Sequence, residues 1–150
     1  IADEGARFNL GTLSRNVNFP AMVLNYLTPE RLPGLRVRRD GHERVAGVDT
    51  LVLGFTETAR PTVVRSGRLD VPAEGRLWVE PLTGRVMKTR LAFDAKDFSG
   101  EITVTYGFIE KLGMWLPVEM VDTMTGAREV VTGRAVYANF RRFGTTSVIK

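Results

Sequence analysis

The sequence predicts a mainly β protein: a curved antiparallel meander sheet, barrel-like but unclosed, covered by one short helix and loops. Apolar and polar residues alternate with a period of two over most of residues 34–143, as in strands buried on one face. Short turns separate these runs, and short turns force neighbouring strands to be antiparallel. With 150 residues, the whole chain, 1–150, is expected to form a single domain.

The N-terminal segment, residues 1–33, is expected to hold one short helix over about 20–28. Asn18 is an acceptable N-cap, and Pro20 suits the first helical turn. Pro29 ends the run. Because the run is apolar nearly all round, we expect the helix to pack onto the sheet.

The first half of the meander is expected to contain strands at 35–39 and 50–56. Asp40-Gly41 is a dipeptide typical of tight turns, so residues 42–46 are a candidate return arm of a hairpin. Residues 58–75 are polar and broken by prolines and glycines. They predict a long loop, of the kind that forms lids, binding loops or mobile surface segments.

The second half shows clearer strand patterns, which bring the expected total to about seven. Gly133 lies inside the last of them and predicts a bulge or bend, which would help the sheet to curl. Turns are expected at Gly84, Gly100, Gly113 and Gly126, between strands at 76–80, 85–93, 102–108, 116–120 and 129–143.

Nine apolar side chains are expected to share one side of this curved sheet, with the helix over part of them. Each set alternates with polar partners, and a one-residue slip in register would expose a whole set to water. The nine are Leu91, Phe93, Ile102, Val104, Tyr106, Phe108, Leu116, Val118 and Met120.

The chain has a net charge of +4, with 17 arginines and 4 lysines. Most of the arginines alternate with apolar residues, which favours a solvated sheet face. An anionic partner, such as membrane headgroups or nucleic acid, is the alternative. Clusters occur only at Arg36, Arg38 and Arg39, and at Arg141 and Arg142. No nucleic-acid partner is expected, because the basic residues are not gathered with exposed aromatic rings.

Residues for catalysis are scarce. The absence of cysteine excludes disulfides, thiolate chemistry and cysteine-rich metal sites. His42 is the only histidine, no serine lies in a Gly-x-Ser-x-Gly motif, and no glycine-rich phosphate loop occurs. Asp94, Asp97 and Glu101 are spaced loosely for calcium, but a solvated turn explains them more simply. We therefore expect no enzyme, no cofactor and no metal.

Two aromatic residues leave both a structural and a contact interpretation open. Trp78 shares a strand face with Arg76 and Glu80, and Trp115 shares one with Glu119. Each tryptophan is a candidate for covering a sheet edge or for facing a partner.

One segment resembles a known family. The sequence of residues 75–86, GRLWVEPLTGRV, has a strand, an acidic residue with a turn, Thr-Gly and a second strand. It resembles periplasmic lipoprotein carriers and outer-membrane lipoprotein-sorting proteins of Gram-negative bacteria, and the similarity continues at 102–106, 112–120 and 135–143. The resemblance implies an unclosed β-barrel whose helices plug an apolar cavity for acyl chains. No counterpart of that family's cavity-gating arginine is assigned.

The expected function is a lipid- or lipoprotein-acyl-chain-binding module, with the nine apolar residues lining its groove. The partner is then a lipid or an acylated protein. The alternative is a non-catalytic structural or interaction domain of a larger exported bacterial protein, with the same face filled by side chains. An open cavity of several hundred Å3 on this face would distinguish the two.

The resemblance also implies a periplasmic or otherwise exported location. The chain starts at Ile1 rather than methionine, so we expect a processed or trimmed product with any signal peptide outside it. No apolar run approaches the ~18 residues of a membrane span, so no transmembrane segment is expected. The sequence does not fix the oligomeric state.

Overall fold

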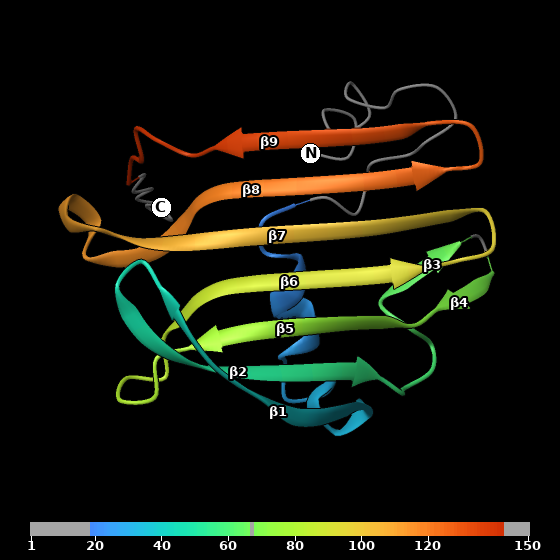
Figure 1. Cartoon of the computed structure of the whole chain (residues 1–150), viewed down its shortest axis with the longest axis horizontal. Coiled ribbons are helices and arrows are strands. Elements are labelled where there is room, and N and C mark those ends of the chain that lie inside the picture. The colour runs from blue at the N-terminus through green and yellow to red at the C-terminus, as the bar shows by residue number, and fades with distance from the viewer. Residues whose placement is uncertain (1–18, 67, 143–150) are drawn as a thin grey trace, which may run out of the picture.

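The structure is a computed structural model that describes residues 19–66 and 68–142. Its seven-stranded sheet is antiparallel throughout and follows chain order, apart from one inserted hairpin (Figure 1). The strands are β1 (Leu35–Val45), β2 (Val48–Glu57), β5 (Ala73–Val79), β6 (Val86–Asp94), β7 (Phe98–Ile109), β8 (Met114–Gly126) and β9 (Val130–Val136).

The sheet does not close, because β1 and β9 stand at its two ends rather than pairing with each other. The predicted fold class, a mainly β antiparallel meander with little helix, is thereby confirmed. The remaining elements are a two-stranded hairpin of β3 (Val64–Ser66) and β4 (Leu69–Val71), and three short 3-10 helices. These helices are η1 (Met22–Tyr26), η2 (Leu32–Gly34) and η3 (Glu110–Leu112).

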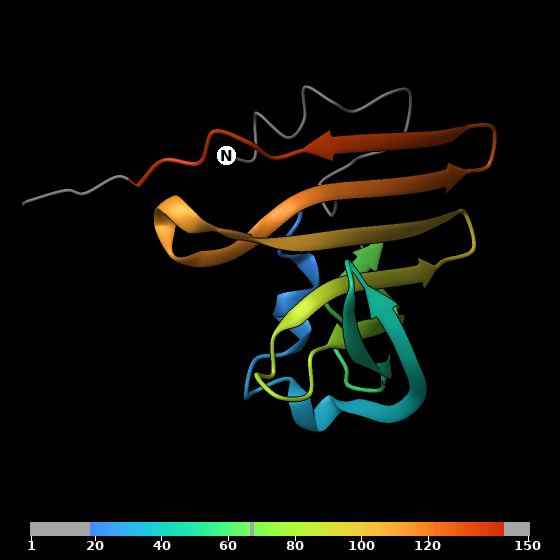
Figure 2. The same ribbon diagram turned by 60° about the vertical axis from the view of Figure 1, so that its left-hand side comes forward.

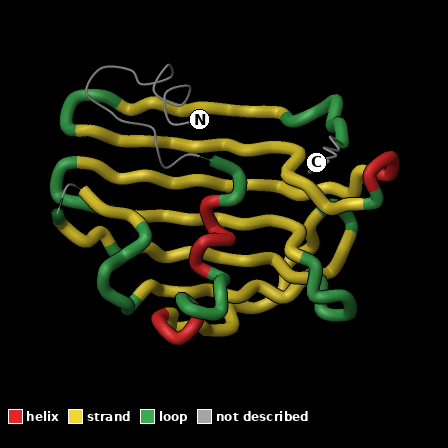
Figure 3. Tube along the Cα trace, turned by 180° about the vertical axis from the view of Figure 1, so that it is seen from behind, coloured by secondary structure: helices red, strands yellow, loops and turns green. Residues whose placement is uncertain are grey.

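The core lies between η1 and one face of the sheet, which we call the inner face; the opposite face is the outer face. Figure 3 shows η1 crossing the middle strands on the inner face. Val64 and Val71 of the small hairpin join the same core. The strands contribute to it through alternate residues, so period-two patterning in the sequence becomes one continuous buried layer.

An aromatic contact fixes η1 to the sheet. Tyr26 is fully buried, and its ring lies 5.5 Å from the ring of Phe55, measured between centroids. Phe55 in turn lies across Gly75 of the neighbouring strand: a Cβ there would come within 2.4 Å of the Phe55 ring. Gly75 therefore leaves the space that the Phe55 ring occupies beside β5.

The predicted helix over 20–28 is shorter and tighter than expected. Only Met22–Tyr26 is helical, in 3-10 form, and Ala21 rather than Asn18 is its N-cap; Asn18 lies outside the described residues. Met22, Val23 and Tyr26 are buried. The expectation that this segment packs on the sheet is confirmed, and burial rather than capping holds it there.

The predicted turn at Asp40-Gly41 is wrong. β1 runs through it with a bulge, and the chain turns at Ala46 and Gly47, which have positive φ values of 48° and 82°. Two positive φ values in succession are the signature of the turn that matches hairpin twist. The Asp40 carboxylate instead accepts hydrogen bonds from Arg38 (2.8 Å) and Arg76 (3.2 Å) on the outer face.

The predicted long loop at 58–75 is also wrong, because it contains the β3–β4 hairpin and the start of β5. The carboxylate of Glu57 holds this region together: it accepts hydrogen bonds from the N–H groups of Val63 (2.8 Å) and Ala73 (3.3 Å). Asp70 similarly accepts one from the N–H of Thr62 (3.0 Å). β3 and β4 have three residues each, which is too short for an alternating pattern to predict them.

The last strand is shorter than the predicted 129–143. Pairing with β8 ends at Val136, and residue 143 lies outside the described residues. The register through Gly133 is regular, so the predicted bulge there is wrong; irregularities occur instead at Arg39/Gly41, Trp78/Val79 and Thr105/Tyr106. The bulge between β7 and β8 matters most for the site below.

The outer face carries a smaller buried cluster near β1. Figure 2 shows β1 and β2 running at a steep angle to β8 and β9, which reflects the twist of the sheet. Trp78 is only 4% exposed, donates its indole N–H to Glu43 (2.7 Å) and lies under the Lys88 ammonium. Its structural interpretation therefore fits the geometry.

Candidate functional site

The nine residues predicted to line an acyl groove fall into three groups. Five form the core of the inner face and are no more than 6% exposed. They pack against η1 and against one another, so this part of the face is filled by the protein's own side chains. The five are Leu91, Phe93, Ile102, Val104 and Met120.

Tyr106 and Phe108 continue the same face of β7 toward the β7–β8 turn. Tyr106 is half-buried and donates its hydroxyl to the carbonyl of Pro20 (3.2 Å), just before η1. Phe108 lies beyond the reach of η1 and is 52% exposed. Coverage of the inner face therefore ends between these two residues.

Leu116 and Val118 lie on the other face, contrary to the prediction that all nine share one side. The bulge opposite Thr105 and Tyr106 adds one residue to β8, so Leu116 pairs with Gly107 instead of with Phe108. A Cβ on Gly107 would lie 2.9 Å from a Val118 methyl carbon, which places Val118 on that face too. One inserted residue inverts the facing of every side chain beyond it.

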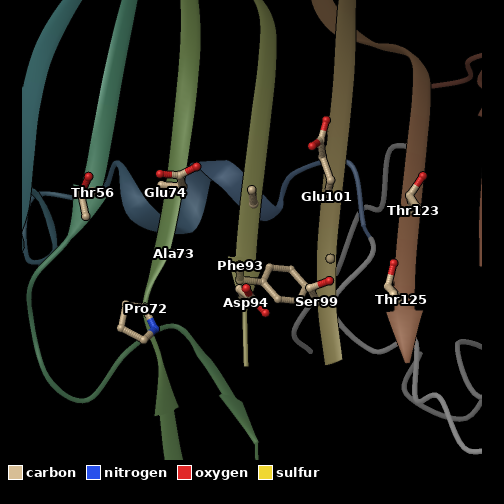
Figure 4. Close-up of a pocket in the computed structure, with 12 residues that line it drawn as sticks. Thr56, Pro72, Ala73, Glu74, Phe93, Asp94, Ser99, Glu101, Thr123 and Thr125 are labelled. Carbon is tan, nitrogen blue, oxygen red and sulfur yellow. The ribbon is translucent and has the colours of Figure 1, made fainter. Parts of the chain in front are cut away.

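The outer face carries a groove of about 730 Å3 across β2, β5, β6, β7 and β8. Figure 4 shows its side chains standing on the strands, with η1 behind the sheet. Seven of its twelve lining residues carry a hydroxyl or a carboxylate, including Thr56, Glu74 and Glu101, and the other five, such as Pro72 and Ala92, are apolar. All three of its charged lining residues, Glu74, Asp94 and Glu101, are carboxylates, which disfavours an anionic ligand in this groove.

One carboxylate of this groove, Glu101, forms an ion pair with Arg90. Arg90 donates to Glu101 at 2.6 Å, and this hydrogen bond lowers the pKa of the Glu101 carboxyl below its ordinary value of 4.5. The same contact raises the pKa of Arg90, which is also near Glu74. The pair contributes little to stability because both side chains are partly exposed.

A second hollow, of about 390 Å3, lies at the end of the β7–β8 hairpin, and we call it the hairpin-end hollow. It combines three apolar side chains with two guanidinium groups. Its lining is Leu112, Met114, Leu116, Arg141 and Arg142.

Two residues with a left-handed backbone conformation, Gly113 and Asn139, bring the segments that line this hollow together. Gly113 has φ 62° after η3, so the chain reverses into β8 with Met114 exposed beside Leu112. After β9 the N–H of Tyr137 donates to Val118, and Asn139 then turns at φ 54°. Asparagine tolerates this conformation better than most residues. The segment that follows carries Arg141 and Arg142 to the hollow.

The hollow's arginines differ from most arginines of the sheet. Arg134 pairs with Glu119, and Arg85 pairs with Glu80 at 3.8 Å. Arg141 and Arg142 are exposed and form no ion pair with the residues that the structure describes. Two guanidinium groups without carboxylates, next to apolar side chains, provide donors that an anionic group can bind bidentately.

Aromatic side chains lie on the opposite face of the same hairpin end. The Phe108 and Trp115 rings are 6.1 Å apart, and the guanidinium of Arg85 lies 5.6 Å from the Trp115 ring centroid. Because Arg85 directly precedes β6, these contacts join the hairpin end to the start of β6. Phe108 remains half exposed. The end of the hairpin is thus apolar on both faces.

Glu57 and Tyr26 are ionisable groups buried outside the hairpin end. Burial raises the pKa of Glu57, against the lowering effect of its two backbone hydrogen bonds and of Arg31. Burial, reinforced by the nearby Glu57 charge, also raises the pKa of Tyr26. Within the described ranges no cluster of carboxylates and histidine has the geometry of a metal site.

The sequence identified only part of the hollow. It predicted Leu116 as a groove residue and noted the Arg141-Arg142 cluster, but it assigned both arginines to a continuing strand. Adjacent arginines also occur inside a strand, at Arg38 and Arg39 of β1, so the pair does not mark where β9 ends. Leu112 and Met114 sit in a predicted turn, where no periodicity marks them.

Comparison of the chain with protein-family models, with curated proteins and with solved structures gives no match. Among the helices of the described segments, none has the length and apolar character needed to cross a membrane.

Proposed function

We propose that the chain is a non-catalytic module that binds an anionic acyl amphiphile, such as a fatty acid or a phospholipid, at the hairpin-end hollow. The acyl chain lies on Leu112, Met114 and Leu116, and the anionic group meets Arg141 and Arg142. The observation that carries the proposal is the presence of both chemistries in one hollow.

The size and the exposure of the hollow support this assignment. A volume of about 390 Å3 lies within the usual range for small-molecule sites. Met114 is 53% exposed, and its unbranched thioether adapts to ligands of variable shape. The resemblance of residues 75–86 to lipoprotein carriers supports the same ligand class. Because that resemblance also implies export, we include an exported location in the proposal.

Binding of dodecyl phosphate to the whole chain tests the proposal, with dodecyl maltoside as the uncharged probe of equal chain length. Below the micelle concentration, isothermal titration should show saturable binding of the phosphate and at least tenfold weaker binding of the maltoside. A tenfold difference corresponds to about 1.4 kcal/mol, within reach of two charge-assisted contacts.

Variants separate the two parts of the ligand. The double variant Arg141→Glu with Arg142→Glu should abolish the preference for dodecyl phosphate over dodecyl maltoside. Met114→Asp should weaken the binding of both ligands. Arg36→Glu with Arg128→Glu is the matched control, because these arginines are also exposed and form no ion pair with a described residue. Equal affinity of wild type and the Arg141/Arg142 double variant for dodecyl phosphate contradicts the proposal.

A structural or interaction domain is the second candidate, and the filled inner face favours it. Leu91 and Ile102 have no exposed surface, as expected of a scaffold rather than a carrier cavity. If wild type binds neither amphiphile, this interpretation replaces the first.

A further inference from the structure

The two edges of the sheet differ in how they are protected from other strands. Edge strands expose unpaired N–H and C=O groups, and proteins block them with charges and bulges. β1 has both: a bulge after Arg39, and charged residues along most of its length. Those charges are Arg36, Arg38, Arg39, Asp40, Glu43 and Arg44.

β9, the top strand in Figure 1, has neither protection. Its sequence is VVTGRAV, its register with β8 is regular, and its single charge is paired with Glu119. Val130 and Val136, at the two ends of the strand, are 65% and 67% exposed. Among the described residues no strand pairs with its far side.

The direction of the free backbone groups follows from one hydrogen bond. The N–H of Tyr137 donates to the carbonyl of Val118 in β8 at 2.9 Å. Because antiparallel strands alternate between bonded and non-bonded pairs, residues 131, 133 and 135 also face β8. The N–H and C=O groups of Val130, Thr132, Arg134 and Val136 therefore point away from the sheet.

We propose that β9 pairs antiparallel with β9 of a second copy, around a two-fold axis at Gly133, and so joins two sheets into one. In this register Val130 lies opposite Val136 of the other copy, and Thr132 lies opposite Arg134. All four outward-facing residues then find backbone partners. The two exposed valines at each end cover each other on the outer face.

Neighbouring registers are worse. A shift of two residues in one direction places Arg134 opposite the same residue of the second copy, and like charges directly opposite are unfavourable. A shift in the other direction places Val130 opposite Arg134 and leaves Val136 without its valine partner. The sequence of β9 is therefore self-complementary in one register, which selects a second copy of this chain as the occupant of the edge.

Sedimentation equilibrium of the whole chain tests this, over about 1 µM to about 1 mM, because one strand pair is a small interface. A monomer–dimer equilibrium is expected. Thr132→Pro should weaken it at least tenfold while leaving the β8–β9 ladder intact, because proline removes only an outward N–H. Val37→Lys, on the guarded edge where Val37 is 55% exposed, is the control and should leave it unchanged.

A charge swap tests the register. Val130→Lys with Val136→Lys should abolish the dimer, because each lysine faces another lysine. Val130→Lys with Val136→Glu should restore it. A monomer at every concentration overturns the proposal, and so does a dimer that both double variants weaken equally. The result is independent of amphiphile binding, because β9 does not line the hairpin-end hollow.

Discussion

The centre of the inner face and the end of the β7–β8 hairpin are built from the same alternating apolar pattern, yet one is closed and the other is open. At the centre, Ile102 and Val104 lie under η1 and are at most 1% exposed. Four residues further along β7, Phe108 is 52% exposed, and Met114 across the turn is 53% exposed. The alternating pattern predicts which side chains are apolar. Whether such a side chain is buried depends on whether η1 covers it.

This difference separates stability from binding within one sheet. At the closed centre, the burial of apolar side chains stabilises the folded state, and their close packing leaves no room for a ligand. The open end gains little stability from folding and keeps apolar surface next to two arginines that form no ion pair with a described residue. We therefore expect substitutions at the centre to affect folding, and substitutions at the end to affect binding.

The largest effect is expected from a carboxylate at the centre. Ile102→Asp buries a charge without a designed partner, at a cost of several kcal/mol, which approaches the total stability of about 5–15 kcal/mol of a typical domain. We expect the loss of a cooperative thermal transition by circular dichroism. Phe108→Asp, on the same face of the same strand, is the control and should still fold. Similar melting temperatures for the two variants contradict the comparison.

A smaller and more quantitative contrast comes from leucine truncation. Leu91→Ala should lower the free energy of unfolding by about 3 kcal/mol, because it leaves a cavity in the filled centre. Leu116→Ala should lower it by less than about 1 kcal/mol, since the side chain is only half-buried. Urea denaturation of both variants measures this. Equal losses mean that the hairpin end is packed as tightly as the core.

The smallest effect concerns pH. Burial raises the pKa of Glu57, so the folded state binds this proton more tightly than the unfolded state. The contribution is fully present below the ordinary value of 4.5 and is lost as pH rises through the higher folded-state pKa. The advantage of wild type over Glu57→Gln should therefore shrink as pH rises from about 4 to about 7.

Glu101 on the open outer face provides the opposite sign. Arg90 lowers the pKa of Glu101, so its contribution is present above 4.5 and is lost as pH falls. The advantage of wild type over Glu101→Gln should grow with pH across the acidic range. Urea denaturation at several pH values measures both slopes, and slopes of the same sign would show that burial does not distinguish the two carboxylates.

Periodicity made the meander predictable, since Leu91, Ile102 and Val104 alternate cleanly and are buried as expected. Features that depend on a single residue could not be predicted from periodicity. The extra residue at Val118 turned Leu116 to the other face, and nothing in the apolar pattern marks it. The same holds for β3 and β4, which depend on the Glu57 carboxylate rather than on alternation.

The candidate site was less predictable than the fold because it joins distant segments. Leu112 and Met114 belong to a turn, whereas Arg141 and Arg142 follow the last strand. Their meeting depends on where β9 ends and on the left-handed turn at Asn139. Neither is encoded in a local hydrophobic pattern.

The methionines allow the central claim to be measured directly. Met114 lines the hairpin-end hollow, whereas the other four, Met22, Met87, Met120 and Met124, are 3–6% exposed. With 13C-labelled methionine methyl groups, titration with dodecyl phosphate should shift the Met114 resonance and leave the four buried ones in place. Shifts confined to Met22, Met120 and Met124, with Met114 unchanged, would place the ligand under η1 and contradict the account.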